Sequence, residues 1–375
     1  MSRDASARET ALSALHRELG ARLVPFAGYL MPLQYAGIRE EHLHTRAQAA
    51  LFDVSHMGQI VIEGALDALE TLVPGDIVGL ATWRQRYTLL TNSEGGIRDD
   101  LMVTRLPDRL FVVANAACKE ADHAHLVAGL GDACAVHLAD DRALLALQGP
   151  AAAAVLAELD DELATLPFMA ARACRLAGHD CLVNRCGYTG EDGFEIALDA
   201  SGAEALARQL LADARVAPAG LGARDSLRLE AGLCLSGTDI DATTSPVAAD
   251  LAWTLARKYR DGSAMPRFPG AAAIMAELAA GAPRVRVGLR PDGRIPLRGG
   301  TELADTAGRS VGIVTSGSFG ASAGHPVAMG YVERALAAPG TRLEVTIRER
   351  RHAVEVCALP FVPHRYYRGR GTPDP

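Results

Sequence analysis

The pattern of the chain changes near residue 265, and this change limits the folds that the chain can adopt. Up to that point helical and strand-like stretches alternate. Residues 266–270 are then rich in proline and glycine, and beyond Arg284 short strand-like runs are separated by glycine turns. We therefore expect a domain boundary within residues 265–283. The last ~90 residues are predicted to form a small β-barrel or sandwich.

Local patterns predict most of the helices and strands of the first part. A helix is expected to begin at a capping box, Ser6 to Glu9, and to end at Gly20. From Gly58 the apolar period changes to two, which is typical of a strand. Further helices are predicted over 38–50, 66–72, 117–130, 151–159, 203–212 and 223–231. Further strands are predicted over 86–91, 97–105, 110–114 and 142–147 and in the stretch that ends at Leu198.

Composition places the chain among globular proteins and excludes two kinds of partner. Of its 375 residues 49% are apolar and 22% charged, so we expect a substantial core and two or three domains. The formal net charge of -7 leaves no basic footprint for nucleic acid. No run of the sequence approaches the ~20 apolar residues of a membrane span. We expect neither nucleic acid nor a membrane as a partner.

The cysteines, the lysines and the first residues narrow the chemistry and the compartment. Seven cysteines are scattered without a CxxC pair, which disfavours a disulfide framework or a zinc site. Neither Lys119 nor Lys258 follows a glycine, so a P-loop is absent. Residues 1–20 contain Asp4 and Glu9 and lack an unbroken apolar stretch, unlike a secretory or mitochondrial presequence. These features predict a protein of the reduced cytosol.

Two glycine-bearing acidic segments are the strongest indication of an enzyme site. Residues 95–100 read GGIRDD, and residues 186–195 read CGYTGEDGFE. Each segment places carboxylates beside a tight backbone bend and an apolar run, which can hold an acid in a pocket away from bulk water. Because successive strand residues face opposite sides, only one of Asp99 and Asp100 can point into a given pocket. A hairpin with solvated acids explains the first segment equally well.

Glu195 also has two interpretations, one structural and one functional. It lies between Phe194 and Ile196, so the alternation of a strand places it on the opposite face, with Ala197. A solvated glutamate on an edge strand explains this pattern. The functional alternative is a carboxylate that accepts two parallel N–H groups of a flat heterocycle, in charge-assisted hydrogen bonds worth ~1.5–3 kcal/mol each.

Three formal motif matches are discounted. Residues 320–324, GASAG, fit the nucleophile elbow of serine hydrolases, but the following His325-Pro326 blocks the helix that an elbow needs. Residues 220–225, GLGARD, lack the third glycine of a dinucleotide fingerprint and a convincing preceding strand, so we expect a helix start with Arg224 directed at a site. Residues 40–44, EEHLH, are interpreted as an exposed polar turn of a helix rather than a metal site.

Taken together, the motifs resemble the glycine cleavage system T protein family of aminomethyltransferases. The similarity covers nearly the whole chain in order, so chance is a poor explanation. The matching segments are 51–58 (LFDVSHMG), 95–101 (GGIRDDL), 187–195 (GYTGEDGFE), 219–225 (AGLGARD), 315–317 (TSG) and 360–362 (PFV).

The resemblance implies both a fold and a reaction. The fold is an α+β cloverleaf of three lobes around a tetrahydrofolate funnel: two folate-binding lobes in residues 1–270, a linker over 271–283 and an all-β barrel over 284–375. The reaction belongs to glycine catabolism and moves the aminomethyl group from the lipoyl arm of the H protein to tetrahydrofolate, with release of ammonia. The products are 5,10-methylenetetrahydrofolate and the reduced lipoyl protein. No metal is implied.

The resemblance also assigns roles to single residues. Asp100 is the acid nearest the reacting folate nitrogens, where a carboxylate can accept a proton and stabilise an iminium-like carbon. Glu195 holds the amino-pyrimidine edge of the pterin and Arg224 orients it. Tyr87 and Tyr188 line the funnel.

Two relatives of the same fold remain as alternatives. A folate-binding protein of iron–sulfur assembly carries a Lys-Gly-Cys motif, whereas this chain has Arg185-Cys186-Gly187 without that lysine. A stand-alone demethylase would move a methyl group from a small donor to tetrahydrofolate. The segments 83–86 and 257–263 differ from familiar family members where a partner could dock, so the fit to the H protein is a weaker expectation than folate binding.

Overall fold

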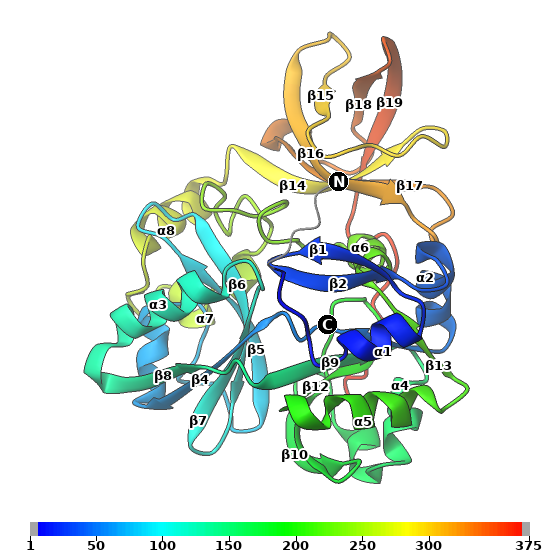
Figure 1. The fold of residues 1–375 in the computed structure, drawn as a ribbon. Helices are drawn as coiled ribbons and strands as arrows, with labels where there is room; N and C mark the ends of the chain where they lie inside the picture. The colour runs from blue at the N-terminus through cyan, green and yellow to red at the C-terminus, as the bar shows by residue number, and fades with distance from the viewer. Residues whose placement is uncertain (1–6, 370–375) are drawn as a thin grey trace.

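The computed structural model describes residues 7–369 and divides into three lobes (Figure 1). Two lobes are built on separate sheets, and the third is a closed barrel that lies above them in this view. The predicted α+β cloverleaf with a C-terminal β-barrel is therefore confirmed. No helix in the described part of the chain is long and apolar enough to cross a membrane.

The first lobe is a five-stranded antiparallel sheet in the order β5-β6-β7-β4-β8. One face of the sheet is apolar and is covered by the helices α3 and η1, because strand residues such as Leu101 and Val103 alternate toward them. The strands are β4 Gly58–Gly64, β5 Arg84–Thr91, β6 Ile97–Arg105, β7 Arg109–Ala114 and β8 Cys134–Leu138. The helices are η1 Leu66–Thr71, α3 Lys119–Leu130 and η2 Gly131–Ala133.

The second lobe is a six-stranded sheet in the order β10-β11-β12-β9-β3-β13, in which only the β3–β13 pair is parallel. Its outer face packs against α4 and α5. The strands are β3 Ala49–Asp53, β9 Arg142–Gln148, β10 Ala171–Leu176, β11 His179–Asn184, β12 Gly193–Asp199 and β13 Val216–Ala219. The helices are α1 Ser13–Glu18, α2 Ile38–Ala47, α4 Ala152–Ala157, η3 Asp161–Thr165, α5 Ala200–Leu211 and α6 Leu221–Glu230.

The inner faces of the two sheets meet in a shared apolar layer. Phe111 and Val113 of β7 contribute from the first sheet, and Ala146 and Ala197 of β9 and β12 contribute from the second. Met102 also packs against this layer. Asp100 shares a strand face with Met102, and Glu195 shares one with Ala197, so both acids belong to the facing sides of the two sheets.

The barrel closes in the order β14-β17-β16-β15-β18-β19 around its own apolar core. It meets the lobes mainly through α6, which packs against β16 and β17. The strands are β14 Arg284–Pro291, β15 Glu302–Ala304, β16 Ser310–Phe319, β17 Pro326–Glu333, β18 Arg342–Ile347 and β19 Arg350–Cys357. The remaining elements are the hairpin β1 Arg22–Phe26 and β2 Tyr29–Gln34, and η4 Ala252–Thr254, α7 Arg257–Arg260, α8 Ala271–Ala280 and η5 Arg334–Leu336.

A buried polar cluster, the barrel junction, ties α2 and α6 to the loop between β16 and β17. It consists of His42, Arg46, Ser226, Glu230 and Ser322. Glu230 Oε2 lies 3.1 Å from both His42 Nε2 and Arg46 Nη2, and Glu230 Oε1 accepts the backbone N–H of Ser322 at 2.8 Å. The ring of His42 also contacts the hydroxyls of Ser226 and Ser322 at 2.9 and 2.8 Å.

Several predicted elements differ from the structure. The first helix begins only at Ser13 without a side-chain cap; Ser6 lies outside the described residues, and Glu9 pairs with Arg17 instead. The helix predicted over 38–50 ends at Ala47, where β3 begins two residues later. The segment predicted as a linker, 271–283, contains the helix α8.

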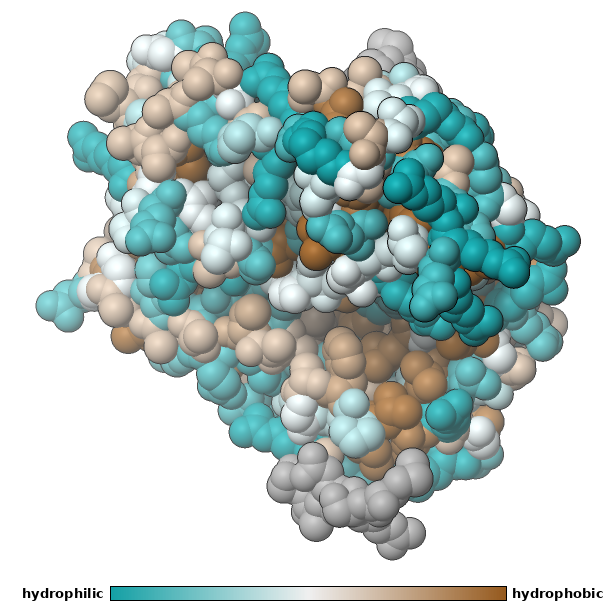
Figure 2. Space-filling model, turned by 90° about the horizontal axis from the view of Figure 1, so that it is seen from above, coloured by the Kyte–Doolittle hydropathy of each residue, from teal (hydrophilic) through white to brown (hydrophobic). Residues whose placement is uncertain are grey.

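The surface mixes polar and apolar residues over most of its area. Seen from above, apolar residues gather mainly in one recessed region near the lower edge of the view (Figure 2). Scattered exposed apolar side chains are normal for a soluble domain, whereas a gathered and recessed group marks a candidate contact surface.

Candidate active site

Asp99 and Asp100 of β6 have different surroundings. Asp99 is fully buried and its carboxylate accepts the backbone N–H of Asn115 at 3.0 Å, the Asn115 amide at 2.9 Å and the Ser236 hydroxyl at 2.7 Å. Asp100 is only half-buried, and its Oδ1 accepts the same Asn115 amide at 2.7 Å. The alternation predicted for this strand is therefore observed, and Asp100 is the acid that remains open on one side.

The position of Asp100 changes its acidity. Burial, followed by the charge of the adjacent Asp99 carboxylate, raises the pKa of Asp100 to about 7. Hydrogen bonds from Asn115 and Tyr87 oppose this rise only in part. A carboxyl group with a pKa near neutrality can both release and accept a proton under ordinary conditions, which is what a general base requires.

Glu195 and Arg224 lie together on the second sheet side. The Glu195 side chain is 7% exposed, and one of its oxygens accepts the Cys186 thiol at 3.5 Å. Arg224 of α6 lies within electrostatic reach of Glu195. The Nη1 atom of Arg224 is buried and has no hydrogen-bond partner among the described residues. A buried donor without a partner is costly, so this atom is a candidate contact for a ligand.

Two tyrosines join the acidic ends of this site. The Arg224 guanidinium lies 4.9 Å from the centre of the Tyr188 ring. Tyr188 is within electrostatic reach of Asp100, and its hydroxyl donates to the Cys234 carbonyl. Tyr87 contacts Asp100 from β5. The five predicted residues thus form one row, from Tyr87 on β5 and Asp100 on β6 through Tyr188, between β11 and β12, to Arg224 on α6 and Glu195 on β12.

Sequence reasoning missed three residues beside this row. Asn115 follows β7 and holds both aspartates. Gln85 is 4% exposed, and its side-chain oxygen and nitrogen have no partner among the described residues. Trp253, with 60% of its surface exposed, stacks on Tyr87 with ring centres 5.5 Å apart. Gln85 could have been found, because it is two residues from Tyr87 and shares its strand face.

The turn before Asp99 approaches another segment very closely. A Cβ atom at Gly96 would lie 1.8 Å from the carbonyl oxygen of Ala242. The next residue, Ile97, donates its N–H to the carbonyls of Asp241 and Thr244. Glycine is therefore required at position 96 to seat the segment 236–244, whose Ser236 binds Asp99.

The discounted motifs have mixed outcomes. Ser322, in the loop 320–324, is followed by β17 rather than a helix, so the loop is not a nucleophile elbow. The interpretation of 40–44 as an exposed turn is wrong, because Glu41 and His42 are buried and bind α6 and its preceding turn. A strand, β13, does precede 220–225, contrary to expectation.

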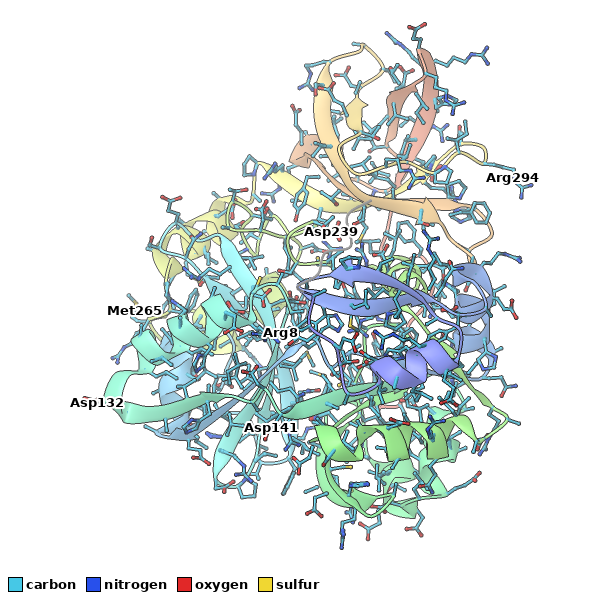
Figure 3. The ribbon with its side chains drawn as sticks, viewed as in Figure 1. Arg8, Asp132, Asp141, Asp239, Met265 and Arg294 are labelled. Atoms are coloured by element: carbon cyan, nitrogen blue, oxygen red, sulfur yellow. The ribbon has the colours of Figure 1, made fainter. Side chains whose placement is uncertain are left out.

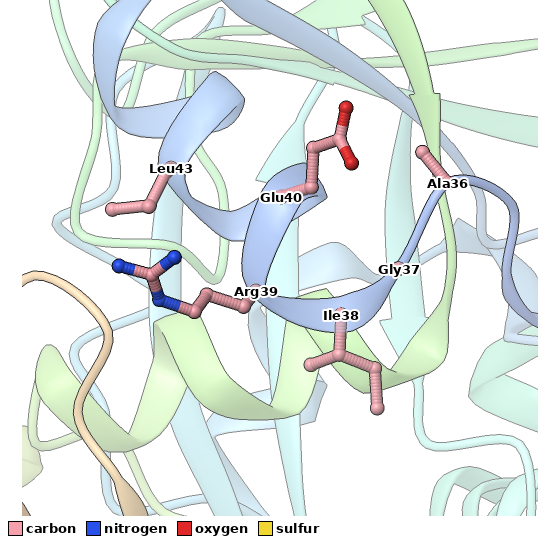
Figure 4. Close-up of a pocket in the computed structure, with 6 residues that line it drawn as sticks. All are labelled: Ala36, Gly37, Ile38, Arg39, Glu40 and Leu43. Atoms are coloured by element: carbon pink, nitrogen blue, oxygen red, sulfur yellow. The ribbon is translucent and has the colours of Figure 1, made fainter.

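The described residues contain no group of three histidine, cysteine, aspartate or glutamate side chains placed to hold a metal ion. One surface hollow is lined by residues at the start of α2 (Figure 4). Most of its lining residues are exposed, and they are different from those of the Asp100–Glu195 row: Ala36, Gly37, Ile38, Arg39, Glu40 and Leu43. The candidate active site is therefore the row between the two sheets.

Comparison with known proteins gives one consistent answer. Residues 12–259 match the family described as GCVT N-terminal domain, and residues 284–363 match the Glycine cleavage T-protein C-terminal barrel domain. The chain belongs to the glycine cleavage T-protein family. The mitochondrial aminomethyltransferase of Gallus gallus is 48% identical and that of Homo sapiens 44% identical, over 96% of this chain and 94% and 91% of theirs.

A solved structure agrees with this assignment to the T-protein family. The crystal structure of glycine cleavage system aminomethyltransferase T from Bartonella henselae superimposes with a TM-score of 0.91 and 46% identity, over 96% of this chain and 100% of that one. The predicted family and the prediction of an aminomethyltransferase are confirmed. This chain is an aminomethyltransferase of the T-protein family.

The prediction of a cytosolic location is wrong by the same comparison. The relatives from Gallus gallus, Dictyostelium discoideum and Homo sapiens are all named mitochondrial enzymes. The expectation rested on the pattern of residues 1–20, and the names of these relatives overturn it.

Proposed function

We propose that this enzyme transfers the one-carbon unit of an aminomethyl-lipoyl H protein to tetrahydrofolate. Two folate nitrogens form bonds to the methylene carbon while its bonds to sulfur and to the amine nitrogen break. The two hydrogens that leave the folate nitrogens end on the departing ammonia and on the lipoyl thiol, so no oxidant is needed. The observation that supports this proposal is the row of residues between the facing sheets, with the half-buried Asp100 at one end and the buried Glu195 at the other.

Asp100 is the proposed catalytic residue. Its half-buried carboxyl group, with a pKa raised to about 7 by burial and by Asp99, can accept a proton from an attacking folate nitrogen near neutral pH. The Asn115 amide donates to one oxygen at 2.7 Å, and the half-buried carboxyl group keeps exposed surface that can face the reacting atoms. A negative charge there also stabilises positive charge that develops on the carbon as ammonia leaves.

Glu195 and Arg224 are the proposed folate-binding residues. The flat amino-pyrimidine edge of a pterin presents two parallel N–H donors, which match the two oxygens of the buried Glu195 carboxylate. The buried Nη1 of Arg224 supplies a donor that is free to orient a carbonyl or ring nitrogen. Tyr87 and Tyr188 supply aromatic walls between the pterin edge and Asp100. Binding then sets the attack geometry.

The domain assignment also remains a proposal. We infer that residues 1–270 form the folate-binding region, that 271–283 connects it to the barrel and that 284–375 form a separate barrel domain. The closed barrel that begins with β14 at Arg284 supports the second boundary. The helix α8 supports a structured connection rather than a flexible one.

Product identity is the experiment that tests the function. Purified enzyme is supplied with aminomethylated H protein and tetrahydrofolate, and ammonia and the folate product are measured together. We expect ammonia and 5,10-methylenetetrahydrofolate in equal amounts. Methyl-folate from a small methyl donor without ammonia would instead identify a demethylase. Folate binding without any product would identify a binding protein.

A further inference from the structure

A third buried acid lies behind the Asp99–Asp100 pair. Asp122 belongs to α3, on the buried stripe that also carries Leu126 and Leu130, and it is 2% exposed. Its Oδ2 atom is buried and accepts no hydrogen bond from any described residue. An ionised carboxylate in that position would be left without a donor, which carries a large desolvation cost.

The carboxyl group of Asp99 is the charged neighbour that acts most strongly on Asp122, and the two side chains are placed to share a hydrogen bond once one of them carries a proton. Two ionised carboxylates can only accept hydrogen bonds and repel each other, so the contact requires one proton between them. Asp99 already accepts three hydrogen bonds from Asn115 and Ser236, so both of its oxygens act as acceptors. The proton therefore belongs on Asp122.

The other charged or titratable groups around this pair do not reverse that assignment. They are Arg98 and Asp100 on β6 and Cys118 at the start of α3. Burial, followed by the Asp99 charge, raises the pKa of Asp122 well above its usual range, while Arg98 lowers it only in part. Asp100 adds a further negative charge, which favours the neutral form of Asp122.

We propose that Asp122 is held as a neutral carboxylic acid that donates a hydrogen bond to Asp99. The resulting pair orients Asp100 through Asn115 and keeps one negative charge beside it. The Asn115 amide bonds to Asp99 at 2.9 Å and to Asp100 at 2.7 Å, so a fixed Asp99 fixes Asp100. Asp122 is a positioning residue, since it touches Asp99 and not the reacting atoms. The inference deepens the proposed function and rests on the role given there to Asp100.

Infrared spectroscopy of the full chain tests where the proton lies. At pH 8, above the pKa of about 7 for Asp100, we expect the carbonyl band of one protonated carboxylic acid in the wild-type protein and its loss in Asp122→Asn. Asp132→Asn is the matched control, because Asp132 is exposed on the outer edge of the first lobe (Figure 3). A missing wild-type band, or a band lost in Asp99→Asn but kept in Asp122→Asn, would overturn the proposal.

Kinetics test whether the pair acts on Asp100. We expect Asp122→Ala to lower kcat about tenfold, which corresponds to the loss of one good hydrogen bond, with the KM for tetrahydrofolate unchanged. Asp122→Asn should restore most of kcat, because its amide can donate to Asp99 without adding charge. Urea unfolding of each variant separates a loss of turnover from a loss of fold. Equal kcat losses in the Ala and Asn variants would contradict the proposed donor.

The pH profile of kcat distinguishes an effect of charge on the pKa of Asp100 from an effect on its position. Asp99→Asn removes the negative charge beside Asp100, which lowers the pKa of Asp100 and moves the acid limb of kcat about one unit to lower pH. Asp122→Asn should keep the wild-type limb. A limb that moves down in Asp122→Asn would show that Asp122 carries charge and would reject the proposal. Failure of the product assay with the infrared band intact would reject the proposed function alone.

Discussion

The barrel junction and the Asp100–Glu195 row both contain charged side chains away from bulk water, but they differ in how completely their carboxylates are paired. At the barrel junction both oxygens of Glu230 are occupied, by Arg46 and His42 on one side and by backbone N–H groups on the other. In the row, Asp100 is open on one side and the Nη1 atom of Arg224 has no partner in the described structure. The first arrangement joins two parts of the protein, and the second leaves polar atoms available to a ligand.

The barrel junction should give the largest effect on stability. Glu230→Ala removes the acceptor shared by Arg46 Nη2 and His42 Nε2, and it leaves the backbone N–H groups of the 320–324 loop without their carboxylate acceptor. Breaking a buried pair in this way costs about 3–5 kcal/mol, and we expect urea unfolding at pH 7 to show such a loss. The matched control is Glu40→Ala on the exposed face of α2, which should change stability by less than about 0.5 kcal/mol.

The contribution of Glu230 should also depend on pH. Burial opposes ionisation, but hydrogen bonds and charge from His42 and the backbone N–H groups of Ser322 and Ala323 lower the pKa of Glu230 from 4.5 to about 2. The folded pKa is depressed, so its stabilisation is full above pH 4.5 and is lost as the pH falls toward 2. A constant difference between wild type and Glu230→Ala over that range would contradict this account.

The open acid of the row should give the largest effect on turnover. We expect Asp100→Asn to lower kcat at least ~100-fold, the lower end of the range for general-base catalysis, while tetrahydrofolate binds as before. Steady-state kinetics with aminomethylated H protein and calorimetry with tetrahydrofolate measure the two effects. Asp108→Asn, in the exposed turn before β7, is a control of equal charge change. Equal activity in Asp100→Asn would remove Asp100 from the chemistry.

The other end of the row should affect binding instead. Glu195→Ala leaves the pterin donors without their charged acceptor, and hydrogen bonds to a charged group are worth about 1.5–3 kcal/mol, or roughly 10- to 150-fold in Kd. Calorimetric titration with tetrahydrofolate measures this change directly. Glu204→Ala, on the exposed side of α5, is the control. An unchanged affinity in Glu195→Ala would exclude the proposed pterin contact.

The pH dependence of wild-type turnover tests the same acid without a mutation, and its effect within one pH unit of neutrality is the smallest expected. Because the carboxylate form of Asp100 is the proposed base and its pKa is raised to about 7, kcat should fall about tenfold per pH unit below that value. The carboxylate form of Asp100 increases as the pH rises, so kcat should level off above pH 8. Stopped assays between pH 5 and 9 measure the limb. A profile that is flat down to pH 5 would assign the base to another group.

The sequence predicted the first sheet better than the second. The strand over 97–105 was placed correctly, because one of its faces meets α3 and η1 and the other is more polar, which gives a clear period of two. β3 was missed because all five of its residues are buried, so alternation disappears; its first two residues were included in the predicted helix 38–50. The short strands β10, β11 and β13 were missed because their sequences do not show so clear a period of two.

The candidate site was predictable in its parts but not in its arrangement. Alternation showed that only one of Asp99 and Asp100 can point into a given pocket, but it could not say which one. The choice of Asp100, and its relation to Glu195 on another sheet, came from the family resemblance. Asp122 was overlooked although a signal existed, since it occupies the buried stripe of α3 beside Leu126 and Leu130. A charged residue at an apolar position of a helix is the mark of a buried polar contact.

Gly96 carries a consequence for how tolerance to mutation is distributed in this protein. Its backbone, in the β5–β6 turn, packs directly against the carbonyl group of Ala242 and leaves no room for even one methyl group. Any larger residue there must push the 236–244 segment outward and carry Ser236 away from Asp99. A survey of natural or clinical variants that scores only residues lining a cavity would class a substitution at position 96 as harmless. Its loss of activity would nevertheless look the same as that of a substitution at Asp99 or Asp100.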